Sequence, residues 1–145
     1  TECRRQRQMC IRDRNISVDM IIQSQRCHSV NGSLTRDVAF TVSQPEGEAT
    51  YQILANAAAK FGWGEVVLES GIAKVSVVGS GMISHSGIAA QMFEALAVSQ
   101  INILMIATSE IKISCVVKEE HGVKALQAIH KAFGLSGNGV VKVPA

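Results

Sequence analysis

The segment with the clearest chemical potential is the glycine- and serine-rich stretch GSGMISHSG at residues 79–87, which precedes a helical pattern. Glycines ahead of a helix can present backbone N–H groups to an anion. The stretch lacks the ending of a P-loop and the full Gly-x-Gly-x-x-Gly spacing, so a nucleotide site is disfavoured. Two compatible interpretations remain: a tight turn whose Ser84 or Ser86 caps the helix, or a binding loop for the amino or carboxylate group of a small ligand.

Other polar residues show no spacing that is typical of catalysis or metal binding. The four histidines form no i, i+4 helical pair of the kind zinc enzymes use. We expect His28, His121 and His130 to be solvated, whereas His85 lies in the Gly-rich stretch, where a catalytic role is disfavoured. Ser109 and Glu110 alone indicate a tight turn with a solvated acid. No nucleophile with its base and no paired carboxylates are recognisable. The sequence therefore predicts no catalytic residue and no metal ligand, and it favours a binding module over an enzyme.

The four cysteines, Cys3, Cys10, Cys27 and Cys115, form no Cys-x-x-Cys pair and match no zinc spacing. Cys115 lies in an apolar strand pattern, where we expect a small buried hydrophobic side chain. A reducing cytosol is the natural compartment for such a chain.

Composition narrows the class of protein further. The chain is 47% hydrophobic and only 4% aromatic, which suits sheets covered by helices of small residues. The net charge of +2 is concentrated in residues 1–14, where five arginines face two acids. The remainder is near neutral, so no nucleic-acid partner is expected. No run approaches the roughly 18 apolar residues of a membrane span, and no membrane partner is expected either.

The first series of elements begins at Ile16. Alternation predicts a strand over 16–23 and a second over 37–42, joined by a long polar tip at 24–36 that contains Asn31-Gly32. Pro45 begins an amphipathic helix over 46–61, which Gly62 ends. Its apolar stripe is expected to be Tyr51, Leu54, Ala55, Ala58 and Phe61. A further strand is predicted at 64–69.

The second series begins at Ala73. We expect a strand through Val75–Val78, a helix after Gly87 and strands at 101–108 and 110–117. A helix over 119–133 follows, and Val140–Val143 could form a closing strand. That last helix is expected to bury Val123, Leu126, Ile129 and Phe133.

The two series are copies of one unit. The sequence NISVDMIIQS (15–24) aligns with QINILMIATS (100–109), and AKFG (59–62) aligns with KAFG (131–134). The second copy has the order β-α-β-β-α-β, which predicts a ferredoxin-like antiparallel sheet with both helices on one face. The first copy lacks its first strand and helix. Residues 1–14 encode neither, so we expect a disordered arm or a segment foreign to the rest.

Residues 74–117 closely resemble the last ACT module of aspartate kinases. The most specific parts are VGSGMISHSGIAA (78–90), FEAL (93–96) and INILMIATSEIKIS (101–114). ISVDMIIQS (16–24) and DVAFTV (37–42) resemble the second half of the preceding ACT module. The resemblance covers roughly residues 15–135. It implies an α+β fold of tandem ACT modules, with a partial module at 15–71 and a second at 72–145.

The resemblance also implies a function. Aspartate kinases use ATP to phosphorylate the side-chain carboxylate of L-aspartate, and their ACT modules bind inhibitory amino acids. The match is closest to the monofunctional kinases that lysine or threonine inhibits. The chain is therefore expected to be the regulatory part of a cytoplasmic kinase (plastidial in a plant). ATP and magnesium would belong to a kinase domain outside it, and the ACT modules would pair in a homodimer or with a kinase subunit.

The same resemblance predicts which residues contact the effector. They come from the Gly-rich loop, the start of the following helix, the 101–108 strand and the turn after it, with two more from the first module: Met82, Ile83, Gly87, Ile88, Ala89, Asn102, Ile103, Thr108, Ser109, Glu110, Asp19 and Gln23. Backbone groups near Ile83, Ile88 and Ile103 would hold the charged ends of an amino acid. Asp19 could accept a lysine ammonium.

Two alternatives are compatible with parts of the pattern. A stand-alone ACT sensor or interaction module would share the fold, and the sequence upstream of Ile16 would discriminate it from a kinase region. A small ferredoxin-fold enzyme such as an acylphosphatase needs a catalytic arginine, and no arginine follows Arg36.

Overall fold

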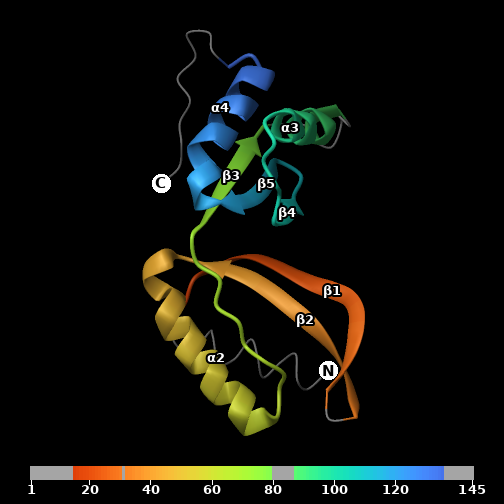
Figure 1. The fold of residues 1–145 in the computed structure, drawn as a ribbon, viewed down its shortest axis with the longest axis vertical. Helices are drawn as coiled ribbons and strands as arrows, with labels where there is room; N and C mark the ends of the chain where they lie inside the picture. The colour runs from red at the N-terminus through yellow and green to blue at the C-terminus, as the bar shows by residue number, and fades with distance from the viewer. Residues whose placement is uncertain (1–14, 31, 80–86, 136–145) are drawn as a thin grey trace. The chain divides into compact units, whose positions relative to one another are not determined.

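The computed structural model describes residues 15–30, 32–79 and 87–135. The chain divides into unit 1 (Thr1–Ser70) and unit 2 (Gly71–Ala145), beside the boundary expected between residues 71 and 72 (Figure 1). The expectations for residues 1–14, for 80–86 and for Val140–Val143 lie outside the described residues.

Unit 1 begins with an antiparallel ribbon of two long strands, β1 (Val18–Val30) and β2 (Ser33–Val42). Because Val30 pairs with Ser33, only two residues connect the strands. The expected long polar tip is therefore wrong: the polar residues continue the ribbon. Backbone ladders need no apolar side chains, and Asn-Gly favours a two-residue connection. Alternation in β1 is as predicted, with Met20 5% exposed and Ile21 62% exposed.

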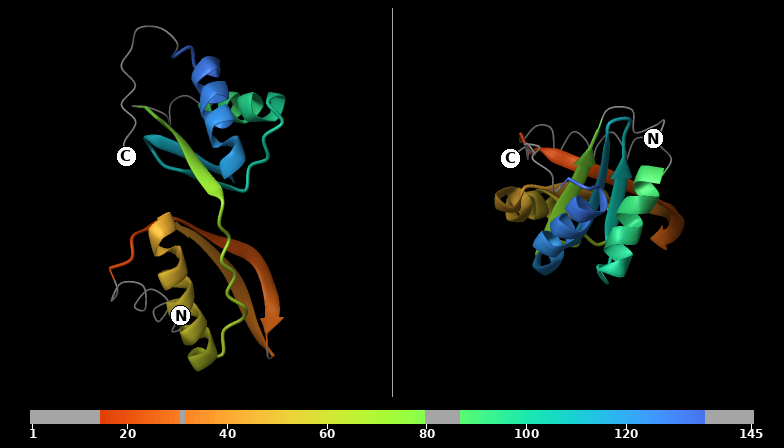
Figure 2. Two further views of the ribbon diagram at one scale, coloured as in Figure 1. Left: turned by 60° about the vertical axis from the view of Figure 1, so that its left-hand side comes forward. Right: turned by 90° about the horizontal axis from the view of Figure 1, so that it is seen from above.

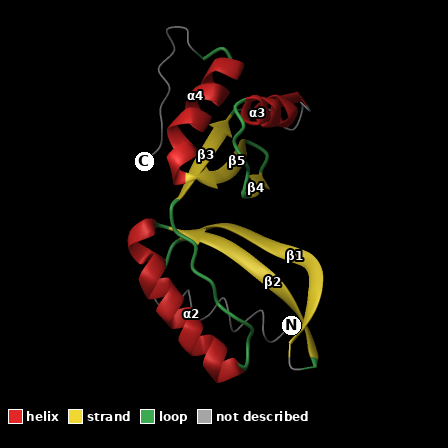
Figure 3. Cartoon of the chain, in the orientation of Figure 1, coloured by secondary structure: helices red, strands yellow, loops and turns green. Residues whose placement is uncertain are grey.

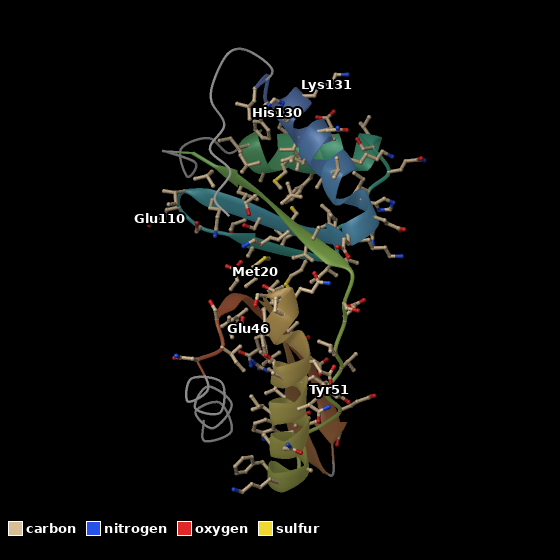
Figure 4. The ribbon with its side chains drawn as sticks, turned by 90° about the vertical axis from the view of Figure 1, so that its left-hand side faces the viewer. Met20, Glu46, Tyr51, Glu110, His130 and Lys131 are labelled. Atoms are coloured by element: carbon tan, nitrogen blue, oxygen red, sulfur yellow. The ribbon has the colours of Figure 1, made fainter. Side chains whose placement is uncertain are left out.

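The helix of unit 1 follows a single 3-10 turn. Figure 4 labels Glu46 at the end of η1 (Gln44–Glu46) and Tyr51 in α2 (Gly47–Phe61). The Ser43 hydroxyl donates to the Glu46 carboxylate, and the Thr50 hydroxyl donates to the Glu46 carbonyl at 2.7 Å. The predicted helix is confirmed. Its expected stripe is half-buried for the most part, whereas Ala57 is buried and Phe61 is 39% exposed.

Residues 64–69, expected to form a strand, are not one. In the described part of unit 1 the sheet contains β1 and β2 alone. A local apolar pattern reports propensity, but a strand forms only where a neighbouring strand supplies hydrogen bonds. Val67 is 75% exposed as a result.

Unit 2 has a three-stranded antiparallel sheet in the order β3-β5-β4 (Figure 3). Figure 2 shows α3 and α4 on the same face of that sheet. Gln91 on α3 donates to the Ala132 carbonyl on α4 at 2.6 Å. The predicted α+β architecture is confirmed. The elements are β3 (Ile72–Val78), α3 (Gly87–Val98), β4 (Met105–Thr108), β5 (Lys112–Lys118), η3 (Glu119–His121) and α4 (Gly122–Ala132).

The core of unit 2 lies between the sheet and the two helices. Met92 and Leu96 of α3 and Cys115 and Val117 of β5 are completely buried. The other buried members are Val75, Ile101, Ile113, Ala125 and Ile129. The expectation that Cys115 is a small buried hydrophobic side chain is confirmed.

Burial also raises the pKa of the Cys115 thiol above its ordinary value of 9.0, because the thiolate would lose its hydration. A raised native pKa means that stability is fully present below pH 9 and is lost as the pH rises toward the native value. We therefore expect the wild-type chain to lose stability relative to Cys115→Ala above pH 9. Urea unfolding of both proteins under reducing conditions from pH 7 to 10 measures this difference. A constant difference throughout would contradict the expectation.

The two strands that flank the β4–β5 turn are shorter than expected. The strand placed at 101–108 begins at Met105, because Ile101 instead ends α3 by donating its N–H to the Leu96 carbonyl at 3.0 Å. The preceding residue, Gln100, has a φ of 55°. This left-handed residue and the 6→1 bond form a Schellman motif. The strand placed at 110–117 begins at Lys112, and Ile111 lies in the turn.

The buried stripe of α4 agrees with the prediction at Ile129 and Phe133 but differs nearer the start of the helix. Val123 is 70% exposed and Leu126 is 48% exposed, whereas Ala125 and Ile129 are buried. Small residues explain the difference. A Cβ added to Gly122 would lie 2.9 Å from the Cβ of Ala73, so the start of α4 lies against β3 too closely for a larger side chain.

The backbone repeats in both units, as the sequence predicts. Asn15 and Gln100, which align in the repeat, are the two described non-glycine residues with positive φ. Gly62 and Gly134, which align in AKFG and KAFG, have φ of 66° and 63°. Trp63, which follows Gly62, donates its N–H to the Ala58 carbonyl, and Leu135, which follows Gly134, donates to the His130 carbonyl, so both helix ends have the same 6→1 bond. Both α2 and α4 also begin with a glycine directly after a 3-10 turn.

Candidate functional site

The best-defined part of the candidate site is the end of the unit 2 sheet where β3 finishes. The N–H of Gly79 donates to the Ile111 carbonyl at 2.9 Å, which joins the end of β3 to the β4–β5 turn. Gly79 is also the first residue of the Gly-rich stretch. The bond therefore fixes where that stretch leaves the sheet.

The β4–β5 turn consists of Glu110 and Ile111, because Ser109 before them is hydrogen-bonded to Lys112 after them. The Ser109 N–H donates to the Lys112 carbonyl at 2.7 Å, and its hydroxyl approaches the same oxygen at 3.3 Å. The structure brings Thr108, Ser109 and Glu110 together here, all exposed. Figure 4 labels Glu110 at the tip. The expected tight turn is confirmed, and its polar side chains are accessible to a small molecule.

The start of α3 contributes mainly backbone groups. Gly87 is its first residue and is exposed, whereas Ile88 and Ala89 pack against the core of unit 2. Their side chains are therefore engaged in packing. N–H groups in the first turn of a helix lack partners within that helix and suit a carboxylate. Met82 and Ile83 lie outside the described residues.

Asn102 and Ile103 lie at the other end of β4 from the turn. Thr108 lies six positions after Asn102, which corresponds to at most roughly 20 Å of extended chain. Asn102 follows the C-terminal end of α3, which is about 18 Å long, while Gly87–Ala89 form its N-terminal end. Asn102 is exposed, and Ile103 packs against the core.

The two remaining predicted residues, Asp19 and Gln23, lie on β1 of unit 1. Both are exposed, and buried Met20 lies between them in the sequence. The β1–β2 register shifts between Val18 and Ile21, and within this irregular part the Met20 N–H donates to the Thr41 hydroxyl at 3.1 Å. The effector role of all twelve predicted residues stays a prediction.

Sequence reasoning did not include Gly79 or Ile111 in the site. Gly79 belongs to the stretch with a possible binding role but is not among the predicted effector contacts, and the predicted strand at 110–117 includes Ile111. An available signal was the position of Ile111 directly after Ser109-Glu110, where a tight turn was already expected.

Within the described ranges, no three His, Cys, Asp or Glu side chains are grouped as a metal site would require. None of the helices described is long and apolar enough to span a bilayer.

Comparison with protein families matches residues 75–133 to an ACT domain. An aspartate kinase of Pseudomonas fluorescens (strain SBW25) is 50% identical over 121 residues, which is 83% of this chain and 28% of that protein. Aspartokinase 2 of Bacillus subtilis (strain 168) is 42% identical over 123 residues, 85% of this chain and 29% of that protein. The chain thus spans less than a third of these curated relatives.

Solved structures with the same fold include a chain that this one covers for the most part, in contrast to the longer relatives above. The ligand-free regulatory subunit of aspartate kinase from Thermus thermophilus is 39% identical, with a TM-score of 0.77 over 90% of this chain and 83% of that one. Aspartate kinase from Synechocystis is 51% identical, with a TM-score of 0.83 over 97% of this chain and 24% of that one.

Proposed function

The chain belongs to the aspartate kinase family, of which it represents the regulatory ACT region, and from that premise we propose that it senses an amino acid and transmits its presence to a kinase. The observation that carries the proposal is the match at 39% identity to four-fifths of a regulatory subunit. The repeated backbone supports it, because a regulatory region of tandem ACT modules is expected to contain one unit twice.

The proposed effector is lysine or threonine, and its charged ends would contact the main chain. The N–H groups at the start of α3 suit the carboxylate. Thr108, Ser109 and Glu110 provide exposed oxygens for the ammonium group or the side chain. Within unit 1, Asp19 is proposed separately to accept the ammonium of a lysine side chain.

Asn102 and Ile103 would take part through a different contact. Asn102 and Ile103 precede β4, whereas Thr108, Ser109 and Glu110 lie at its other end. We assign Asn102 and Ile103 to a site completed by another ACT module, as in a homodimer or a complex with a kinase subunit.

The mechanism would be differential binding. An effector that binds one arrangement of the ACT modules more tightly shifts the population toward it, and the coupling free energy acts on the kinase. The kinase reaction would be ATP- and magnesium-dependent phosphorylation of L-aspartate in the cytoplasm. ATP and magnesium would bind to the kinase domain, while this chain would contribute the effector response.

A thermal-shift experiment tests the proposal. Added at about 100 times its dissociation constant, an effector that binds only the native chain stabilises it by about 2.7 kcal/mol. We expect millimolar L-lysine or L-threonine to raise the melting temperature of the chain by several degrees. The D-enantiomers are the matched control, because they have equal charge and size. No shift with any aspartate-derived amino acid would contradict the proposal.

A further inference from the structure

Ile111 is an unusual residue for the position it occupies. It is one of the two residues that connect β4 to β5, where Gly, Asn, Asp and Ser are usually found. Its side chain is 58% exposed. Neither the turn geometry nor the core of unit 2 therefore accounts for a β-branched apolar side chain here.

Two backbone hydrogen bonds fix the main chain at Ile111, from which the side chain extends. The Ile111 carbonyl accepts the N–H of Gly79 at 2.9 Å, and the turn is closed by the Ser109 N–H to the Lys112 carbonyl at 2.7 Å. The residue opposite Ile111 is thus Gly79, directly after β3, which has no side chain to cover it. The apolar surface of Ile111 is left accessible beside the exposed polar groups of Thr108, Ser109 and Glu110.

The size of this surface indicates what can cover it. A half-exposed isoleucine offers on the order of 100 Å² of apolar surface. This area is comparable to that of the methyl and methylene groups of one amino-acid side chain, and the exposed polar groups of the turn lie beside it in the sequence.

We propose that Ile111 is a specificity-determining residue that contacts the aliphatic part of the amino-acid effector, while its polar neighbours in the turn contact the effector's charged or hydroxyl groups. This inference rests on the proposed function. It adds an apolar contact to a site otherwise composed of backbone and polar groups. One methyl or methylene group in an apolar contact changes affinity by about tenfold or more when it is fully enclosed, and by less beside a turn.

The experiment compares amino acids that differ by one carbon. Isothermal titration calorimetry measures the affinity of the full chain for L-threonine and L-serine, and for L-lysine and L-ornithine. Wild type, Ile111→Val and Ile111→Ala form a graded series. Val123→Ala is the matched control, because Val123 is 70% exposed on α4 and lies at the opposite end of β5 from the turn.

We expect Ile111→Ala to weaken binding of the longer amino acid about three- to tenfold and to reduce its preference over the shorter one, with Ile111→Val intermediate and Val123→Ala unchanged. Melting temperatures without ligand verify that each variant folds. Wild-type binding with an unaltered preference in Ile111→Ala would overturn the inference and leave the proposed function intact. An equal loss for both members of a pair would also overturn it, since that indicates a change in the turn. No binding by the wild-type chain would overturn both proposals.

Discussion

Leu96→Ala is expected to lower the free energy of unfolding of unit 2 by about 3–5 kcal/mol. Leu96 is completely buried between the sheet and the helices, so truncation removes apolar contacts and leaves a cavity. A domain of this size is stable by only about 5–15 kcal/mol, so the loss approaches the limit of folding. Urea unfolding followed by far-UV circular dichroism measures it. Trp63, the only tryptophan, reports unit 1 separately.

Leu126→Ala is the matched control, with the same chemical change at a helix position that is 48% exposed. Its expected cost is below about 1 kcal/mol. The pair also discriminates between the two assignments of the α4 stripe, since the sequence pattern placed Leu126 in the core. Equal losses in the two variants would contradict the observed burial.

Gly122→Ala is expected to destabilise unit 2 by about 1–3 kcal/mol, although alanine is the better helix former. The new Cβ would lie 2.9 Å from the Cβ of Ala73, and both neighbours are fixed in packed elements. The same chemical-denaturation experiment measures the loss. Ala73→Gly in the same chain removes the contacting atom, so the double variant should recover part of the loss as a coupling energy.

Gly47→Ala provides the control at the corresponding helix start in unit 1. Its new Cβ would meet only the Leu68 Cδ1 at 3.7 Å, an ordinary contact. Helix propensity then dominates, and we expect a gain of about 0.5–1 kcal/mol in unit 1. A loss at Gly47 as large as the loss at Gly122 would show that steric contact is not the cause.

The features that could be predicted from the sequence are those encoded within a few residues. Pro45 lies in the 3-10 turn that leads into α2, and Gly62 ends that helix. The aligned AKFG and KAFG segments predicted two helix ends, and the structure shows a left-handed glycine at both. The core residues Ile113, Cys115 and Val117 lie in the strand predicted at 110–117, although Ser114 and Val116 between them are also buried. At the helix ends and at these core positions the local pattern and the final environment agree.

The predictions that failed depended on partners distant in the chain. The apolar run at 64–69 has strand character, but its backbone pairs with neither β1 nor β2. In α4 the apolar pattern predicted Ile129 and Phe133 correctly but Val123 and Leu126 wrongly, because the start of the helix approaches Ala73 closely through Gly122. For the site, resemblance provided the residues, but no spacing rule could show that Asn102 and Ser109 lie at opposite ends of β4. Nor could a spacing rule show that the Gly79 N–H donates a hydrogen bond to the Ile111 carbonyl.

The register of the unit 2 sheet has a consequence for synthesis on the ribosome. Ile72 pairs with Lys118, so β3 emerges long before its only described neighbour in the sheet exists. At roughly 5–20 residues per second, the nascent chain would hold an apolar, unpaired β3 for a few seconds. The β1–β2 hairpin, closed by two residues, can form within microseconds of leaving the exit tunnel. Cotranslational folding would therefore proceed from unit 1 to unit 2, with the interval before β5 emerges as the period of greatest exposure to aggregation and to chaperones.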